Sequence, residues 1–200
     1  MGTSGCGKTT SMKYLDAAYS KIFPSMRHYI LDTKLDGDFD DFPGRVLSDV
    51  CPVKPRSNDR YQVWQVVKIV PDEIEKWLWQ IRKDPPAVLE IDELYSLVYK
   101  RNEYSAEYNI IQKVGRSLPI GTITLTQELS KIPQNAYKQS NHRLGFYLEG
   151  RYDRLVRNDM LKYPVEQPID LYGMYYQHIN ARGQPAYYKD IQSFLGIKSK

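Results

Sequence analysis

The chain has 200 residues, of which 42% are hydrophobic and 26% charged, and its formal net charge is +4. This length suits one domain with a sizeable core, and the charge permits binding to a polyanion without requiring it. Two cysteines exclude a disulfide framework and favour a reducing cytosol, and no apolar run approaches the roughly 20 residues of a membrane span.

Short apolar segments alternate with longer amphipathic ones along the chain. Apolar side chains at helical spacing predict helices, and runs rich in β-branched and aromatic residues predict strands. The expected helices span residues 10–23, 72–83 and 105–118. The expected strands span residues 28–31, 61–70, 87–91, 121–126 and 144–148. This alternation predicts an α/β fold of three layers, in which helices cover both faces of a mainly parallel sheet.

The last part of the chain predicts an antiparallel hairpin. Residues 172–179 and 186–191 are two strand-like segments, and they flank the turn Asn180-Ala181-Arg182-Gly183. We therefore expect a hairpin over about residues 172–191 at the end of a single domain that comprises residues 1–200.

The N-terminal residues match the phosphate-binding pattern G-x-x-x-x-G-K-[ST]. The matching residues are Gly2, Thr3, Ser4, Gly5, Cys6, Gly7, Lys8 and Thr9. The glycines let backbone N–H groups surround an anion, and the following helix adds the positive end of its dipole. We expect Lys8 to bind the β- and γ-phosphates of ATP, Thr9 to bind Mg²⁺ and Thr10 to belong to the same nucleotide site. The alternative is a glycine-rich turn that matches the pattern by chance.

A phosphate loop normally follows a central strand, yet Met1 alone precedes Gly2 in this sequence. We therefore expect that a first strand of about 5–6 residues belongs before the loop and is missing from the sequence as given.

A mostly apolar strand ends in two carboxylates, Asp92 and Glu93. In an ATPase, the first acid holds Mg²⁺ and the second polarises the attacking water, so the pair favours hydrolysis over phosphate transfer to another acceptor. The alternative is a surface pair that caps the next helix. Glu90 lies on the same strand face as Asp92, and the sequence assigns it no role.

The strand at residues 121–126 ends in Gln127. A neutral amide at the tip of a strand beside the acidic pair can sense the γ-phosphate or position water. The alternative is a polar residue that only ends the strand.

Several of these segments together resemble the FtsK–HerA superfamily of ring-forming DNA translocases. Residues 114–121 read V-G-R-S-L-P-I-G and lead into the strand that ends in Thr126-Gln127, with Pro133 downstream. The segment Asp32-Thr33-Lys34 resembles the superfamily's Asp-x-Lys signature, although an acid-rich turn explains it equally well. The resemblance covers most of the chain from Gly2 to about Leu148.

The resemblance implies a P-loop NTPase core of the RecA/ASCE type that uses ATP and Mg²⁺ to move double-stranded DNA through a homo-oligomeric ring, expected to be a hexamer. It implies that Gln127 senses the γ-phosphate and that Arg116 reaches into the neighbouring subunit's site as an arginine finger. Arg143 and Arg151 are rivals for that role, and a surface salt bridge is the alternative for each arginine.

The chain lacks the membrane helices and extra domains of cellular segregation and conjugation motors. It therefore most resembles viral genome-packaging ATPases, which implies the host cytoplasm or the virion as its location and a capsid or portal vertex as a docking partner. A cellular or conjugative DNA translocase and an ATPase for phage or protein export or assembly are the alternatives.

Overall fold

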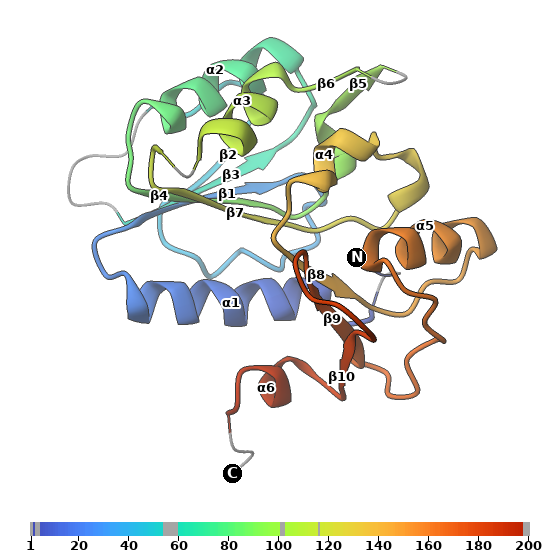
Figure 1. Ribbon diagram of the computed structural model, residues 1–200. Helices are drawn as coiled ribbons and strands as arrows, with labels where there is room; N and C mark the ends of the chain where they lie inside the picture. Colours follow the sequence, from blue (N-terminus) through green and yellow to red (C-terminus); the bar gives the residue numbers. More distant parts are fainter. Residues whose placement is uncertain (1, 3–4, 54–59, 101–102, 116, 198–200) are drawn as a thin grey trace. The chain divides into compact units, whose positions relative to one another are not determined.

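The computed structural model describes residues 2, 5–53, 60–100, 103–115 and 117–197 (Figure 1). The chain forms two compact units. The central unit comprises Ala17–Leu125, and the terminal unit comprises Met1–Asp16 together with Thr126–Lys200.

Five parallel strands form the sheet of the central unit, in the order β2-β3-β1-β4-β7. They are β1 (Arg27–Asp32), β2 (Arg45–Ser48), β3 (Tyr61–Val66), β4 (Ala87–Ile91) and β7 (Ile120–Thr124). The interior strands β1, β3 and β4 are buried along almost their whole length. Their buried polar side chains have hydrogen-bond partners, and these are His28, Asp32, Gln62, Gln65 and Glu90. The predicted parallel α/β sheet is confirmed.

Helices cover both faces of this sheet (Figure 1). Successive residues of a strand point to opposite sides, so both faces offer side chains against which a helix can pack. On one side, the Tyr29 ring meets the edge of Trp77 from α2 (Pro71–Arg82), with ring centroids 6.2 Å apart. On the other side, His28 Nε2 lies 3.1 Å from Ser20 Oγ near the end of α1 (Lys8–Ile22). The helix α3 (Ala106–Val114) joins α2 through an ion pair between Arg82 and Glu107. The three predicted layers are therefore present.

Several predicted elements of the central unit end earlier than expected; the strand expected over 121–126, for example, ends at Thr124. The helix expected over 105–118 ends at Val114, and a turn follows in which the N–H of Ser117 bonds the Val114 carbonyl at 2.9 Å. The strand expected over 61–70 ends at Val66, where the parallel neighbour β2 also ends. Short elements follow β4, namely the 3-10 helix η1 (Leu94–Leu97) and the strands β5 (Val98–Lys100) and β6 (Glu103–Tyr104).

The terminal unit contains a three-stranded antiparallel sheet in the order β10-β9-β8. Its strands are β8 (His142–Gly145), β9 (Met174–His178) and β10 (Ala186–Tyr188), and β9 and β10 pair where the hairpin is expected. Its helical segments are η2 (Leu129–Lys131), α4 (Gln134–Lys138), α5 (Arg151–Leu161) and α6 (Ile191–Phe194). Throughout the described part of the chain, no helix has the length and apolar character needed to cross a bilayer.

A buried arginine braces the segment between α5 and β9. Arg157 is 1% exposed, and its guanidinium donates to the carbonyls of Phe146 and Val165 at 3.1 and 3.0 Å. It also donates to Gln167 Oε1 at 2.9 Å. Burial lowers the pKa of this guanidinium, and the surrounding carbonyl groups compensate for the buried charge. These bonds fix the irregular chain that leads toward β9.

Candidate active site

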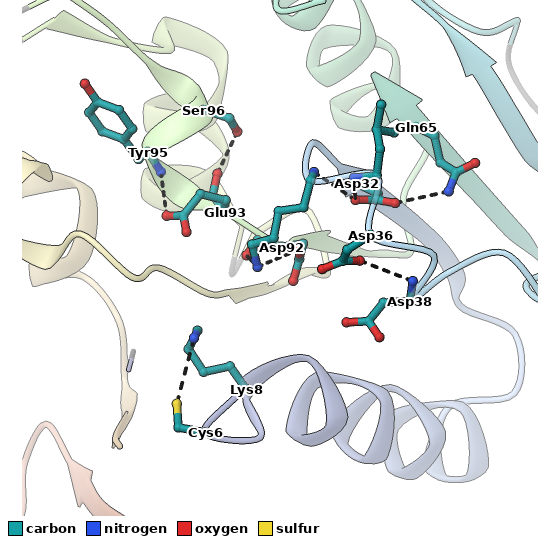
Figure 2. A network of polar contacts seen from close by, with 12 residues as sticks. Cys6, Lys8, Asp32, Asp36, Asp38, Gln65, Asp92, Glu93, Tyr95 and Ser96 are labelled. Carbon is teal, nitrogen blue, oxygen red and sulfur yellow. Dashed lines mark hydrogen bonds and ion pairs between the residues drawn. The ribbon is translucent and has the colours of Figure 1, made fainter. Parts of the chain in front are cut away.

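The phosphate loop has the backbone that an anion cradle requires. Gly5 and Gly7 have φ angles of 75° and 83°, which other residues rarely adopt, and α1 begins directly afterwards at Lys8. Lys8 is 4% exposed, and its Nζ lies 3.8 Å from Cys6 Sγ (Figure 2). Thr9 is half-buried and Thr10 exposed. The helix dipole and these backbone N–H groups together favour a bound phosphate.

The start of the loop lies beside the end of the glutamine strand, within the terminal unit. Gly2 N donates to the carbonyl of Thr126 at 3.2 Å. A Cβ atom on Gly2 would lie 2.5 Å from Phe146 Cβ, so no larger residue fits there. The half-buried Gln127 follows Thr126 directly. The structure therefore brings Gln127 and the first glycine of the loop into one neighbourhood.

In the central unit, Asp92 follows β4 and is completely buried. Its N–H donates to the Leu31 carbonyl at 3.1 Å. This hydrogen bond extends the pairing of β4 with β1 by one residue beyond Ile91. Lys34 Nζ lies 2.8 Å from Asp92 Oδ2 and donates a hydrogen bond to the Asp92 carbonyl at 3.2 Å. The Asp92 carboxylate is thus paired with the ammonium group of Lys34.

Asp32 explains how Lys34 reaches this position. Its Oδ1 accepts the backbone N–H groups of Lys34 and Leu35 at 3.1 and 3.2 Å, and its Oδ2 accepts from Gln65 Nε2 at 3.1 Å (Figure 2). Leu35 has a φ of 54°, so the chain turns sharply at this point. The segment Asp32-Thr33-Lys34 is therefore an acid-stabilised turn, and this turn places its lysine on Asp92.

Glu93 is half-buried and caps the 3-10 helix η1. Its Oε1 accepts the backbone N–H of Tyr95 at 3.3 Å, and its carbonyl accepts from Ser96 Oγ at 2.6 Å (Figure 2). The sequence left open that this acid caps the next helix, and the local contacts of Glu93 are those of such a cap. A cap of this kind also fixes the direction of the carboxylate, which a water-activating base requires.

Glu90 forms a buried pair that the sequence did not predict. Its Oε1 lies 3.2 Å from His28 Nδ1, and the two side chains are 1% and 0% exposed. His28 Nε2 faces Ser20 Oγ, which in turn lies 2.7 Å from the Tyr61 hydroxyl. This polar chain ties β4 to β1, β3 and the end of α1, two residues before Asp92. The signal in the sequence is a carboxylate inside an apolar strand, and the pairing of β4 with β1 brings it within reach of a histidine two register positions away.

The three candidate arginines differ in their surroundings. Arg116 lies outside the described residues, as do Thr3 and Ser4 of the phosphate loop. Arg143 is 6% exposed, and its guanidinium donates to the carbonyls of Lys138, Ser140 and Met160. Arg151 is exposed at the first position of α5. Because Arg143 is committed to backbone groups of its own chain, it is poorly placed to act on a neighbour.

The candidate metal ligands have the chemistry that Mg²⁺ prefers. Thr9 offers a hydroxyl oxygen and Asp92 a carboxylate, and hard oxygen donors suit this ion. Lys34 Nζ lies 2.8 Å from one oxygen of the Asp92 carboxylate. Taken singly, each of the two residues is of a type that Mg²⁺ accepts as a ligand.

Comparison with solved structures gives the same overall architecture. The genome-packaging NTPase B204 from Sulfolobus turreted icosahedral virus 2, in complex with AMPPCP, superposes with a TM-score of 0.73 at 19% identity, over 94% of each chain. The DNA-packaging ATPase B204 from Sulfolobus turreted icosahedral virus gives a TM-score of 0.72, also at 19% identity and over 94% of each chain. The chain has the fold of the viral packaging ATPases.

The cytoplasmic domain of the type VII secretion ATPase EccC from Thermomonospora curvata superposes with a TM-score of 0.63 at 15% identity, over 94% of this chain and 24% of that chain. EssC (ATPases 2 and 3) from Geobacillus thermodenitrificans superposes with a TM-score of 0.66 at 13% identity, over 98% of this chain and 41% of that chain. Comparisons of the sequence with protein-family models and with curated proteins give no match. The resemblance drawn from the sequence is therefore confirmed at the level of the fold.

Proposed function

We propose that this chain binds and hydrolyses ATP. The observation that carries the proposal is the built phosphate loop, in which two positive-φ glycines lead directly into α1 and its buried Lys8. B204, which has the same fold, was solved in complex with ATP-gammaS and with AMPPCP. A loop of this sequence and backbone on this fold favours a nucleoside triphosphate over an unrelated anion.

Each residue then has a distinct task. Lys8 and the loop N–H groups bind the phosphates and offset charge that develops during phosphoryl transfer. Glu93 accepts a proton from the attacking water, and Gln127 contacts the γ-phosphate or that water. Thr9 and Asp92 are the residues that would hold Mg²⁺, which when bound neutralises phosphate charge.

We further propose that hydrolysis drives translocation of double-stranded DNA during packaging of a viral genome. This chain and B204 each cover 94% of the other, so the likeness extends over almost all of the sequence compared. A motor that tracks the phosphate backbone needs no sequence-reading motif. The proposal includes a homo-oligomeric ring, expected as a hexamer, in which Arg116 or Arg151 acts on the neighbouring site, and docking on a capsid or portal vertex in the host cytoplasm or virion.

A secretion or export ATPase is the second candidate, and the superposition on the type VII secretion ATPase EccC is the observation that favours it. This chain covers 24% of the EccC chain, so a secretion role would require it to work with further parts. A cellular or conjugative DNA translocase would differ from a packaging motor in its genomic neighbours. Stimulation of hydrolysis by duplex DNA separates the translocases from a secretion motor.

The ATPase proposal is tested with Glu93→Gln, which keeps the shape of the side chain and removes its basicity. We expect a fall in kcat of about 100-fold or more, because a general base contributes roughly 10²–10⁴ in rate. Binding of AMPPCP, measured by calorimetry, should persist. The exposed Glu166 provides the matched control Glu166→Gln, which should hydrolyse ATP like the wild type. Full hydrolysis by Glu93→Gln would contradict the role assigned to Glu93.

A further inference from the structure

The residues assigned so far account for the phosphates and the metal but not for the rest of the nucleotide. Lys8, Thr9 and the loop N–H groups recognise anionic oxygens and their counterion, whereas a purine offers a flat apolar face. A nucleoside triphosphate extends beyond the loop that holds its phosphates. The base must therefore contact groups outside the phosphate loop.

An aromatic ring from the C-terminal part of the terminal unit lies against this loop. A Cβ atom on Gly7 would lie 3.0 Å from Tyr172 Cδ1 and 3.7 Å from Tyr172 Cβ and Cγ. The ring thus lies where a side chain on the glycine that directly precedes Lys8 would project. Tyr172 is 52% exposed, so a substantial part of its surface remains open. Two neighbours on the same segment, Ile169 and Leu171, are also exposed and apolar.

The backbone around Tyr172 is braced. Gly173 N donates to the Asp170 carbonyl at 2.9 Å, and the Tyr187 hydroxyl donates to Asp170 Oδ2 at 2.7 Å. A Cβ atom on Gly173 would collide with that hydroxyl, so a side chain at this position would displace the Tyr187 ring. One residue later, Met174 is completely buried in the cluster that also contains Cys6 of the phosphate loop. The same packing therefore fixes the loop and the turn that carries the ring.

We propose that Tyr172 is a nucleotide-binding residue that packs its ring against the adenine base of ATP. The inference rests on the proposed ATP binding and extends it to the base. An aromatic ring that is half-exposed, held on a braced turn and beside the phosphate loop suits this task, because a base stacks well on a preorganised aromatic face. It also gives the C-terminal segment, far from the loop in sequence, a direct part in nucleotide binding.

The test compares two ligands that share their phosphates and differ in the base. Binding of AMPPCP and of inorganic tripolyphosphate, each with Mg²⁺, is measured by calorimetry for the wild type, Tyr172→Ala and Tyr172→Phe. We expect Tyr172→Ala to weaken AMPPCP binding by about 5- to 100-fold, in line with alanine replacement of base-stacking rings. Tripolyphosphate binding should stay at the wild-type level, and Tyr172→Phe should bind both ligands like the wild type.

The exposed Tyr152 on α5 supplies the control variant Tyr152→Ala, which should bind both ligands normally. Wild-type AMPPCP affinity in Tyr172→Ala would overturn the inference. So would an equal loss for both ligands, since the ring would then only support the loop. A wild-type protein that binds neither ligand would instead contradict the proposed ATP binding itself, and the inference with it.

Discussion

At the scale of single residues, the pairing of Lys34 with Asp92 is the contact in the candidate site that sequence reasoning weighted least. The Asp-Thr-Lys segment was explained equally well as an acid-rich turn, and the structure shows that it is such a turn, with Asp32 as its acid. The turn has a consequence that no local pattern reveals, because Asp92 lies 58 residues from Lys34 in the chain. The pairing of β1 with β4 brings the two together.

A double-mutant cycle measures this contact. Lys34→Met removes the ion pair that Lys34 makes with the completely buried Asp92 carboxylate. We expect it to lower the free energy of unfolding by about 1–3 kcal/mol, below the full cost of breaking a buried pair because Lys34 is partly exposed. The measurement is urea unfolding followed by circular dichroism.

The companion variants are Asp92→Asn and the double variant. Because the two residues interact, the double variant should lose clearly less stability than the sum of the single variants. Strict additivity would show that the ion pair contributes nothing to the folded state.

At the scale of elements, the sequence predicted what depends on local pattern and missed what depends on tertiary contacts. The strand at residues 87–91 and the helix that follows the phosphate loop were predicted closely, because buried apolar runs and helical spacing are local signals. The helix α5 was not predicted, since its sequence RYDRLVRNDML is mostly polar. Its buried side includes Arg157, a residue type that a search for apolar spacing passes over.

The cap of α3 gives a prediction at this scale. Ser105 is completely buried, and its side chain accepts the N–H of Tyr108 at 3.0 Å. We expect Ser105→Ala to lower the free energy of unfolding by about 0.5–2 kcal/mol, the usual cost of losing a side-chain cap. Ser117 is exposed and follows the same helix, so Ser117→Ala provides a control with little expected effect. Equal stability of the two variants would contradict the assigned cap.

At the scale of the whole molecule, the motifs identified the candidate residues, whereas the structure was needed to show what holds them. The glycine pattern alone predicted the loop and the place of Lys8, because the positive-φ glycines and the start of the helix are neighbours in the sequence. Cys6 packs with Phe146, Met174 and Ile191, which come from the other end of the chain. The spacing of residues along the sequence does not predict such a contact. The position of Tyr172 beside Gly7 escaped prediction for the same reason.

We propose that this chain is an ATPase whose hydrolysis serves the movement of DNA. The most direct measurement is the steady-state rate of ATP hydrolysis with and without duplex DNA, at low salt because phosphate contacts weaken as salt rises. We expect duplex DNA to raise the rate of the wild type, and we expect the rate of Glu93→Gln to stay about 100-fold or more below it with or without DNA. Hydrolysis that depends on Glu93 and ignores DNA would contradict the translocase and favour a secretion or assembly motor.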